Sequence, residues 1–76
     1  MNDLEATAAA FEGHGHVWNR KGSDRMHRGD ELRFVGQLAE AEKEYRRAAR
    51  AFGAAVVVYD VALDLYRRSD THPRQI

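Results

Sequence analysis

The sequence predicts a small all-α protein, a bundle of three helices packed as helical hairpins. Apolar residues recur at steps of three and four along most of the chain, which is the periodicity of an α-helix. The single proline, Pro73, lies close to the C-terminus. Residues 56–66 also alternate like a strand, but no second strand candidate exists to pair with them, so we favour a helix there.

The first predicted helix begins at Asn2 or Asp3, because both residues are good N-caps. Its apolar side consists of small and large residues at alternating steps of four and three: Leu4, Ala8, Phe11, Gly15 and Trp18. A glycine inside a helix costs about 1 kcal/mol relative to alanine. Gly13 and Gly15 therefore predict that this helix kinks or ends between residues 13 and 20.

The second predicted helix covers about residues 24–35. Gly22 and Ser23 read as a turn before it, with Ser23 as the N-cap. Gly29 interrupts the segment, and its apolar content is low.

The third predicted helix covers residues 38–68 and carries the clearest pattern in the chain. Large residues and alanines alternate along it at heptad spacing, and the alanines let a neighbouring helix approach closely. We call this row the seam: Leu38, Ala41, Tyr45, Ala48, Phe52, Ala55, Tyr59, Ala62 and Tyr66. The seam predicts a tight helix–helix contact.

Gly53 leaves two alternatives open for this third helix. A helix that ends at Gly53 would have to restart at Ala54 or Ala55, which are poor caps. A continuous helix would be about 46 Å long, whereas a compact chain of this size has a radius of gyration of about 11 Å. We favour the continuous helix, which leads us to expect a second chain on the seam, as in a coiled-coil homodimer. Residues 1–68 then form one helical domain, followed by a disordered polar tail over residues 69–76.

Composition excludes several classes of function. Twelve Lys and Arg balance twelve Asp and Glu, and the absence of cysteine excludes disulfides, thiolate zinc sites and cysteine nucleophiles. No phosphate-binding loop, catalytic triad or His-Glu-x-x-His motif is present, so we expect no enzymatic activity and no cofactor. The acidic start and the lack of a long apolar run lead us to expect a cytoplasmic protein without a membrane span.

Residues 28–49 resemble the centre of a tetratricopeptide repeat. The resemblance rests on a glycine in the first helix, a glycine at the turn, a Glu-Ala pair, an aromatic residue and a small residue: Gly29, Gly36, Glu40, Ala41, Tyr45 and Ala48. It implies a hairpin of two closely crossing helices that binds a partner protein. The groove-facing positions that the resemblance implies are Ser23, Met26, Asp30, Arg33 and Phe34.

The main functional hypothesis is a non-catalytic protein–protein interaction module that self-associates through the seam and binds a partner protein. Trp18 is either a core anchor or an exposed contact for the partner. The alternative hypothesis is a regulator that binds nucleic acid through the basic stretch between residues 20 and 33. Its candidate phosphate contacts are Arg20, Lys21, Arg25 and Arg28, which otherwise form a solvated or internally paired face.

His14 and His16 are the candidate metal ligands in the sequence. Two imidazoles beside Glu12 are plausible ligands for zinc, nickel or copper. Residues two apart on a helix point in different directions, so a joint site requires an extended backbone at Gly15. We favour surface histidines without a metal.

Overall fold

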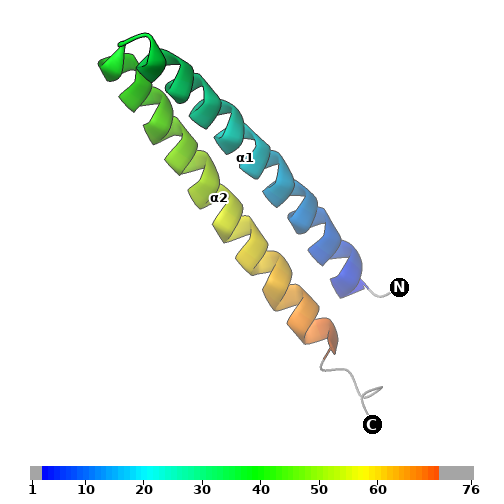
Figure 1. The fold of residues 1–76 in the computed structure, drawn as a ribbon. Helices are drawn as coiled ribbons and strands as arrows, with labels where there is room; N and C mark the ends of the chain where they lie inside the picture. The colour runs from blue at the N-terminus through cyan, green and yellow to red at the C-terminus, as the bar shows by residue number, and fades with distance from the viewer. Residues whose placement is uncertain (1–2, 71–76) are drawn as a thin grey trace.

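The computed structural model describes residues 3–70, which form two long antiparallel α-helices. Helix α1 covers Asp3–Phe34, and helix α2 covers Leu38–Asp70. The helices lie side by side along their whole length and are joined by a short turn at one end (Figure 1). The result is a rod of 60 × 14 × 14 Å.

The prediction of three helices is wrong, because its first two helices form the single helix α1. Gly15 and Gly22 are helical, and Ser23 lies inside α1 rather than at its start. Each glycine in α1 costs about 1 kcal/mol of helix propensity. Contact with α2 along the entire length of α1 offsets this cost, since tertiary packing supplies most of the stability of a helix in a protein.

Helix α2 is continuous through Gly53, as favoured, and residues 56–66 are helical rather than extended. Its covering helix is α1 of the same chain, so a second chain is not needed to explain its length. The radius of gyration, 17.4 Å, exceeds the expected value of about 11 Å because the hairpin is a rod rather than a compact bundle.

The turn between the helices is specified by Gly36. This residue has a φ of 84°, in the left-handed region that glycine adopts without steric cost. The Gly36 amide donates to the Arg33 carbonyl at 3.0 Å, and the Gln37 amide donates to the Leu32 carbonyl at 2.9 Å. These two bonds form a Schellman motif, which satisfies the last carbonyls of α1. The Gln37 carbonyl accepts the first helical bond of α2, from Ala41, at 3.0 Å.

The core between the helices is built from small residues. Within residues 3–70, every fully buried apolar side chain is an alanine: Ala8, Ala41, Ala48, Ala51, Ala55 and Ala62. Gly15, Gly22 and Gly29 are the buried glycines of α1. The two backbones therefore approach closely, and the large side chains lie beside the contact rather than inside it.

An aromatic ring of α2 lies on each buried glycine of α1. A Cβ atom added at Gly15, Gly22 or Gly29 would come within 3.0 Å of the ring of Tyr59, Phe52 or Tyr45, respectively. The glycines and the rings both recur every seven residues, in opposite directions along the antiparallel helices. Glycine here leaves room for a ring. These three contacts fix the register of the hairpin.

The open end of the hairpin extends beyond the predicted domain boundary at residue 68. Ser69 is 2% exposed, and its hydroxyl donates to Glu5 Oε1 at 3.1 Å. Residues 71–76 of the predicted tail lie outside the described part of the chain. Within residues 3–70, neither helix contains a segment that is long and apolar enough to span a membrane.

Candidate functional site

The predicted seam is occupied by α1 of the same chain. Its alanines Ala41, Ala48, Ala55 and Ala62 are buried, and its aromatic residues are half-buried over α1. Leu38, at the start of the seam, is 65% exposed. The seam is thus a tight helix contact, as predicted, but its partner is the preceding segment of the chain rather than a second copy.

The hydroxyl groups of the aromatic row bind polar side chains of α1. The Tyr45 hydroxyl donates to Asp30 Oδ1 at 2.5 Å, and the Tyr66 hydroxyl donates to Glu12 Oε1 at 3.1 Å. The hydrogen bond from each hydroxyl to its carboxylate, followed by desolvation, raises the pKa of both tyrosines above 10.0. The two carboxylates therefore hold both rings against α1 and keep the tyrosine hydroxyls protonated.

His16 belongs to the same row of contacts, and His14 does not. Tyr59 Oη and His16 Nδ1 are hydrogen-bonded at 2.7 Å, and the two rings meet edge to face. The ring of His14 instead meets Phe11, with centroids 6.4 Å apart. The backbone at Gly15 is helical rather than extended, which keeps the two histidines on different sides of α1. In the described part of the chain, no group of three or more His, Asp or Glu side chains is placed to hold a metal ion.

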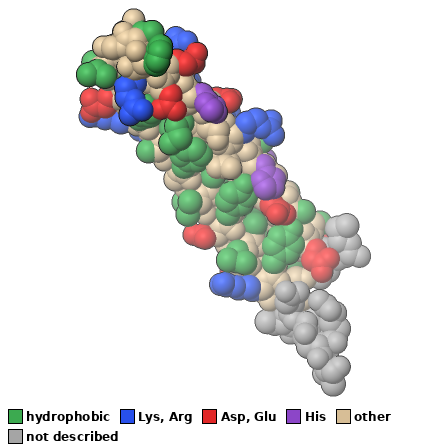
Figure 2. All heavy atoms as spheres, viewed as in Figure 1, with side chains coloured by type: hydrophobic (Ala, Val, Ile, Leu, Met, Phe, Trp, Pro, Cys, Tyr) green, Lys and Arg blue, Asp and Glu red, His purple; other side chains and the backbone are tan. Residues whose placement is uncertain are grey.

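Large apolar side chains remain exposed on the outside of the hairpin. One group lies toward the open end and consists of four residues of α2: Val56, Val57, Val61 and Leu63. We call this group the outer apolar surface. The pairs Gly15–Tyr59 and Gly22–Phe52 place Val17 at the level of Val56 and Val57, but it lies two residues after Gly15, on the side of α1 that faces away from α2. On the face shown in Figure 2, hydrophobic side chains follow the length of the molecule.

The residues implied by the tetratricopeptide resemblance are all exposed, but they do not form one site with Trp18. Ser23, Met26, Asp30 and Arg33 follow each other at steps of three and four, so they share one side of α1. Asp30 is already bonded to Tyr45. Phe34, at the end of α1, is 91% exposed. Trp18 lies on a different side, in a groove between the helices.

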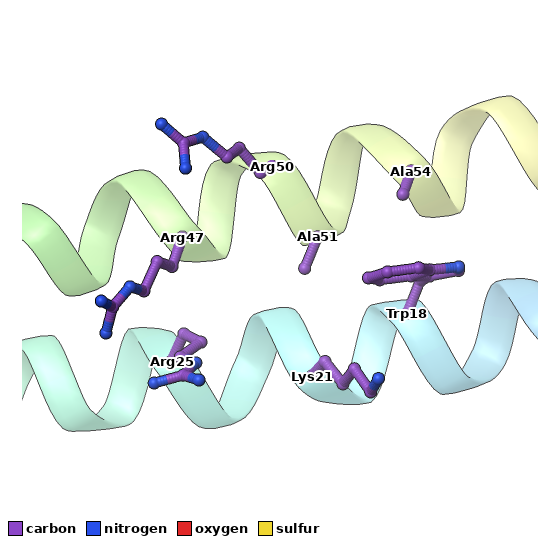
Figure 3. A pocket seen from close by; sticks show the side chains of 7 residues that line it. All are labelled: Trp18, Lys21, Arg25, Arg47, Arg50, Ala51 and Ala54. Carbon is purple, nitrogen blue, oxygen red and sulfur yellow. The ribbon is translucent and has the colours of Figure 1, made fainter.

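This groove joins the aromatic side chain to a cluster of cations. Its volume is about 380 Å³, and Figure 3 shows the seven residues that line it: Trp18, Lys21, Arg25, Arg47, Arg50, Ala51 and Ala54. Trp18 is 39% exposed, and Lys21 Nζ lies 4.9 Å from the centroid of its ring. A second hollow of about 450 Å³ adjoins the groove through shared residues and is lined by Lys21, Asp24, Arg25 and Arg28.

Glu44 organises the cations of the groove. Its side chain is almost buried, and its carboxylate accepts hydrogen bonds from Arg25 Nη1 at 3.1 Å and from Arg47 Nη1 at 3.0 Å. One carboxylate thus holds a guanidinium group from each helix. Because a guanidinium has five N–H donors, both arginines keep donors for another ligand.

The sequence pointed to part of this cluster and missed the rest. Lys21, Arg25 and Arg28 line the two hollows as a group, whereas Arg20 lines neither. Arg47 and Arg50 come from α2, more than twenty residues beyond Arg25, and neither is among the residues that the sequence predicted for a site. The seven-residue spacing shared by the glycines of α1 and the aromatic residues of α2 is the signal that would have placed them beside Arg25.

Comparison with known proteins adds no relative. No protein-family model matches the chain, and no curated protein and no solved structure is significantly similar to it. The tetratricopeptide resemblance therefore stays a prediction.

Proposed function

We propose that the chain is a non-catalytic protein–protein interaction module whose partner is a second copy of itself, bound through the outer apolar surface. The observation that carries this proposal is an imbalance in burial. The fully buried apolar side chains of the described residues are all alanines, whereas ten large hydrophobic residues are exposed. A helical protein normally gains most of its stability by burying its large apolar side chains, which this hairpin does only in part.

The distribution of exposed residues favours the open end of the rod for the contact. Four large apolar residues fall within eight consecutive positions of α2: Val56, Val57, Val61 and Leu63 are 58%, 64%, 38% and 47% exposed. They leave α2 apolar on its outer sides, while α1 covers its inner side. A second hairpin packed there would bury them in a four-helix arrangement.

The size of the rod is compatible with a stable interface. A whole long side measures 60 × 14 Å, which is close to the about 800 Å² that each partner buries in a protein interface of standard size, so the second copy has to extend along the rod from the outer apolar surface. Zero net charge also removes the overall repulsion between copies.

Size-exclusion chromatography with light scattering tests the proposal at tens of micromolar protein. We expect a dimer or a larger assembly for the wild type and a monomer for Val57→Glu/Val61→Glu. The control is Val35→Glu/Leu38→Glu, which changes a valine and a leucine at the turn that are 64% and 65% exposed. It should keep the wild-type mass. A monomeric wild type refutes the proposal, and so does a Val57→Glu/Val61→Glu variant that keeps the wild-type mass.

A further inference from the structure

We infer that the groove between Trp18 and the arginines binds single-stranded nucleic acid, with the tryptophan stacking on a base and the cations holding the flanking phosphates. This inference does not rest on self-association, because no residue of the outer apolar surface lines the groove. It also differs from the basic stretch in the sequence, since it draws on both helices and excludes Arg20.

The groove carries an excess of positive charge. The whole chain has no net charge, but cations outnumber carboxylates around the groove and its adjoining hollow. The carboxylates there are those of Asp24 and Glu44. The five cations are Lys21, Arg25, Arg28, Arg47 and Arg50. Phosphate groups bind to such a cluster with release of counterions.

Two arginines of the groove are held in place, and two others have no ion pair among the described residues. Arg25 and Arg47 are fixed by Glu44, so their guanidinium groups are already placed at the walls of the groove. Figure 3 shows Arg47 extending from α2 toward Arg25, while Arg50 extends away from α1 at the outer rim. Within residues 3–70, Arg28 and Arg50 have no ion pair, which leaves their charges uncompensated by the protein.

Trp18 makes the groove suitable for a nucleic acid rather than a simple anion, because its ring can stack on a base. Its side chain extends from α1 toward Ala54 of α2, and both residues line the groove (Figure 3). Lys21 occupies a position over the ring, but such a contact at an exposed site is weaker than the stacking of a base on an aromatic ring. A base that displaces Lys21 from the ring leaves the ammonium group free to bind the adjacent phosphate.

The combination favours an unpaired strand over a duplex. A duplex offers phosphates and groove edges but keeps its base faces stacked, so it cannot use the tryptophan. An unpaired strand exposes both groups. The ring and the three cations that α1 supplies fall between residues 18 and 28, a length of about 15 Å, which suits a short stretch of strand.

The test uses the full chain and a fluorescently labelled oligothymidylate of fifteen nucleotides at low salt. Trp18 is the only tryptophan, so its emission reports stacking directly. We expect quenching of this emission on binding, together with an affinity that falls as salt rises, with a log–log slope of about −3 for four phosphate contacts. The same oligonucleotide annealed to its complement should bind less tightly and quench less.

Two variants with equal loss of charge locate the site. Arg28→Gln/Arg50→Gln removes two unpaired arginines of the groove and hollow, and we expect it to weaken binding at least tenfold. Arg20→Gln/Arg67→Gln removes two exposed arginines that line neither, and it should change the affinity less than about twofold. Trp18→Ala should weaken binding measured by anisotropy at least fivefold.

Several outcomes overturn the inference. They are no binding of the oligothymidylate at 25 mM salt, binding without quenching of Trp18, equal or tighter binding of the duplex, and equal losses in the two double variants. Inorganic polyphosphate can be added as a competitor for the cations. The inference expects the tryptophan emission to recover in proportion to the oligonucleotide that polyphosphate displaces. Quenching by polyphosphate alone contradicts it, because polyphosphate has no ring to stack.

Discussion

Replacing the buried glycines of α1 by alanine should destabilise the hairpin, although alanine is the better helix former. Gly22 is the clearest case, since an added Cβ would lie 2.6 Å from a ring carbon of Phe52. Atoms cannot approach this closely, so the ring has to leave its place on α1. A matched pair of controls exists in Gly13 and Gly53, where nothing lies within 4 Å of an added Cβ.

The magnitude follows from the burial of the ring. A fully buried aromatic side chain removes roughly 150–250 Å² from water, and half of that, about 100 Å², corresponds to about 2.5 kcal/mol for the half-buried Phe52. The alanine returns about 1 kcal/mol of helix propensity. Gly22→Ala should therefore lower the free energy of unfolding by about 1.5 kcal/mol, and Gly13→Ala and Gly53→Ala should raise it by about 1 kcal/mol.

Thermal and urea unfolding followed by circular dichroism at 222 nm measures these changes, at one fixed protein concentration. The midpoint should fall by about 6–12 °C in Gly22→Ala and rise by about 4–8 °C in the controls. In a Phe52→Ala background the ring is absent, so Gly22→Ala should become stabilising. If Gly22→Ala stabilises the wild type as much as Gly13→Ala does, the glycine–aromatic register is refuted.

Two further predictions concern polar contacts between the helices. Because the folded-state pKa of Tyr45 is raised by its bond to Asp30, this contact stabilises the fold fully below the unfolded pKa of about 10, and the stabilisation is lost as the pH rises through the folded pKa. Asp30→Asn should thus shift the ionisation of Tyr45, followed by absorbance at 295 nm, to lower pH; an unchanged titration contradicts the assignment. Glu44→Ala should lower the free energy of unfolding, measured in urea, by about 1 kcal/mol, because it leaves Arg25 and Arg47 without their shared carboxylate. Glu42→Ala breaks a solvent-exposed pair with Arg46 and should lower it by less than about 0.5 kcal/mol. Equal costs for the two substitutions would show that the buried position of Glu44 has no energetic consequence.

The sequence allowed a correct prediction of α2 and an incorrect one of α1. The seam of α2 is visible because alanine and aromatic residues are both compatible with a helix, so the local pattern and the fold agree. In α1 the same contact requires glycine, whose local preference opposes a helix. Gly15 and Gly22 therefore look like helix ends when α1 is considered alone, and their role appears only when their spacing is matched to Tyr59 and Phe52.

The groove was only partly predictable for a related reason. Lys21, Arg25 and Arg28 are close in the sequence and stand out as a basic cluster. Arg47 and Arg50 belong to the groove only because the turn at Gly36 and the glycine–aromatic contacts set the register of the two helices. Without that register, both arginines look like ordinary solvated positions on α2.

We propose that a hairpin with an alanine and glycine core completes its burial against a second copy. The midpoint of thermal unfolding as a function of protein concentration, from 2 to 200 µM, tests this claim most directly. A hundredfold rise in protein concentration stabilises a folded dimer against unfolding by about 2.7 kcal/mol. With an unfolding entropy of about 2.1 cal/mol/K per residue of the dimer, the midpoint should rise by about 8 °C. A midpoint that stays constant over this range, with the mass of a monomer throughout, would contradict the claim.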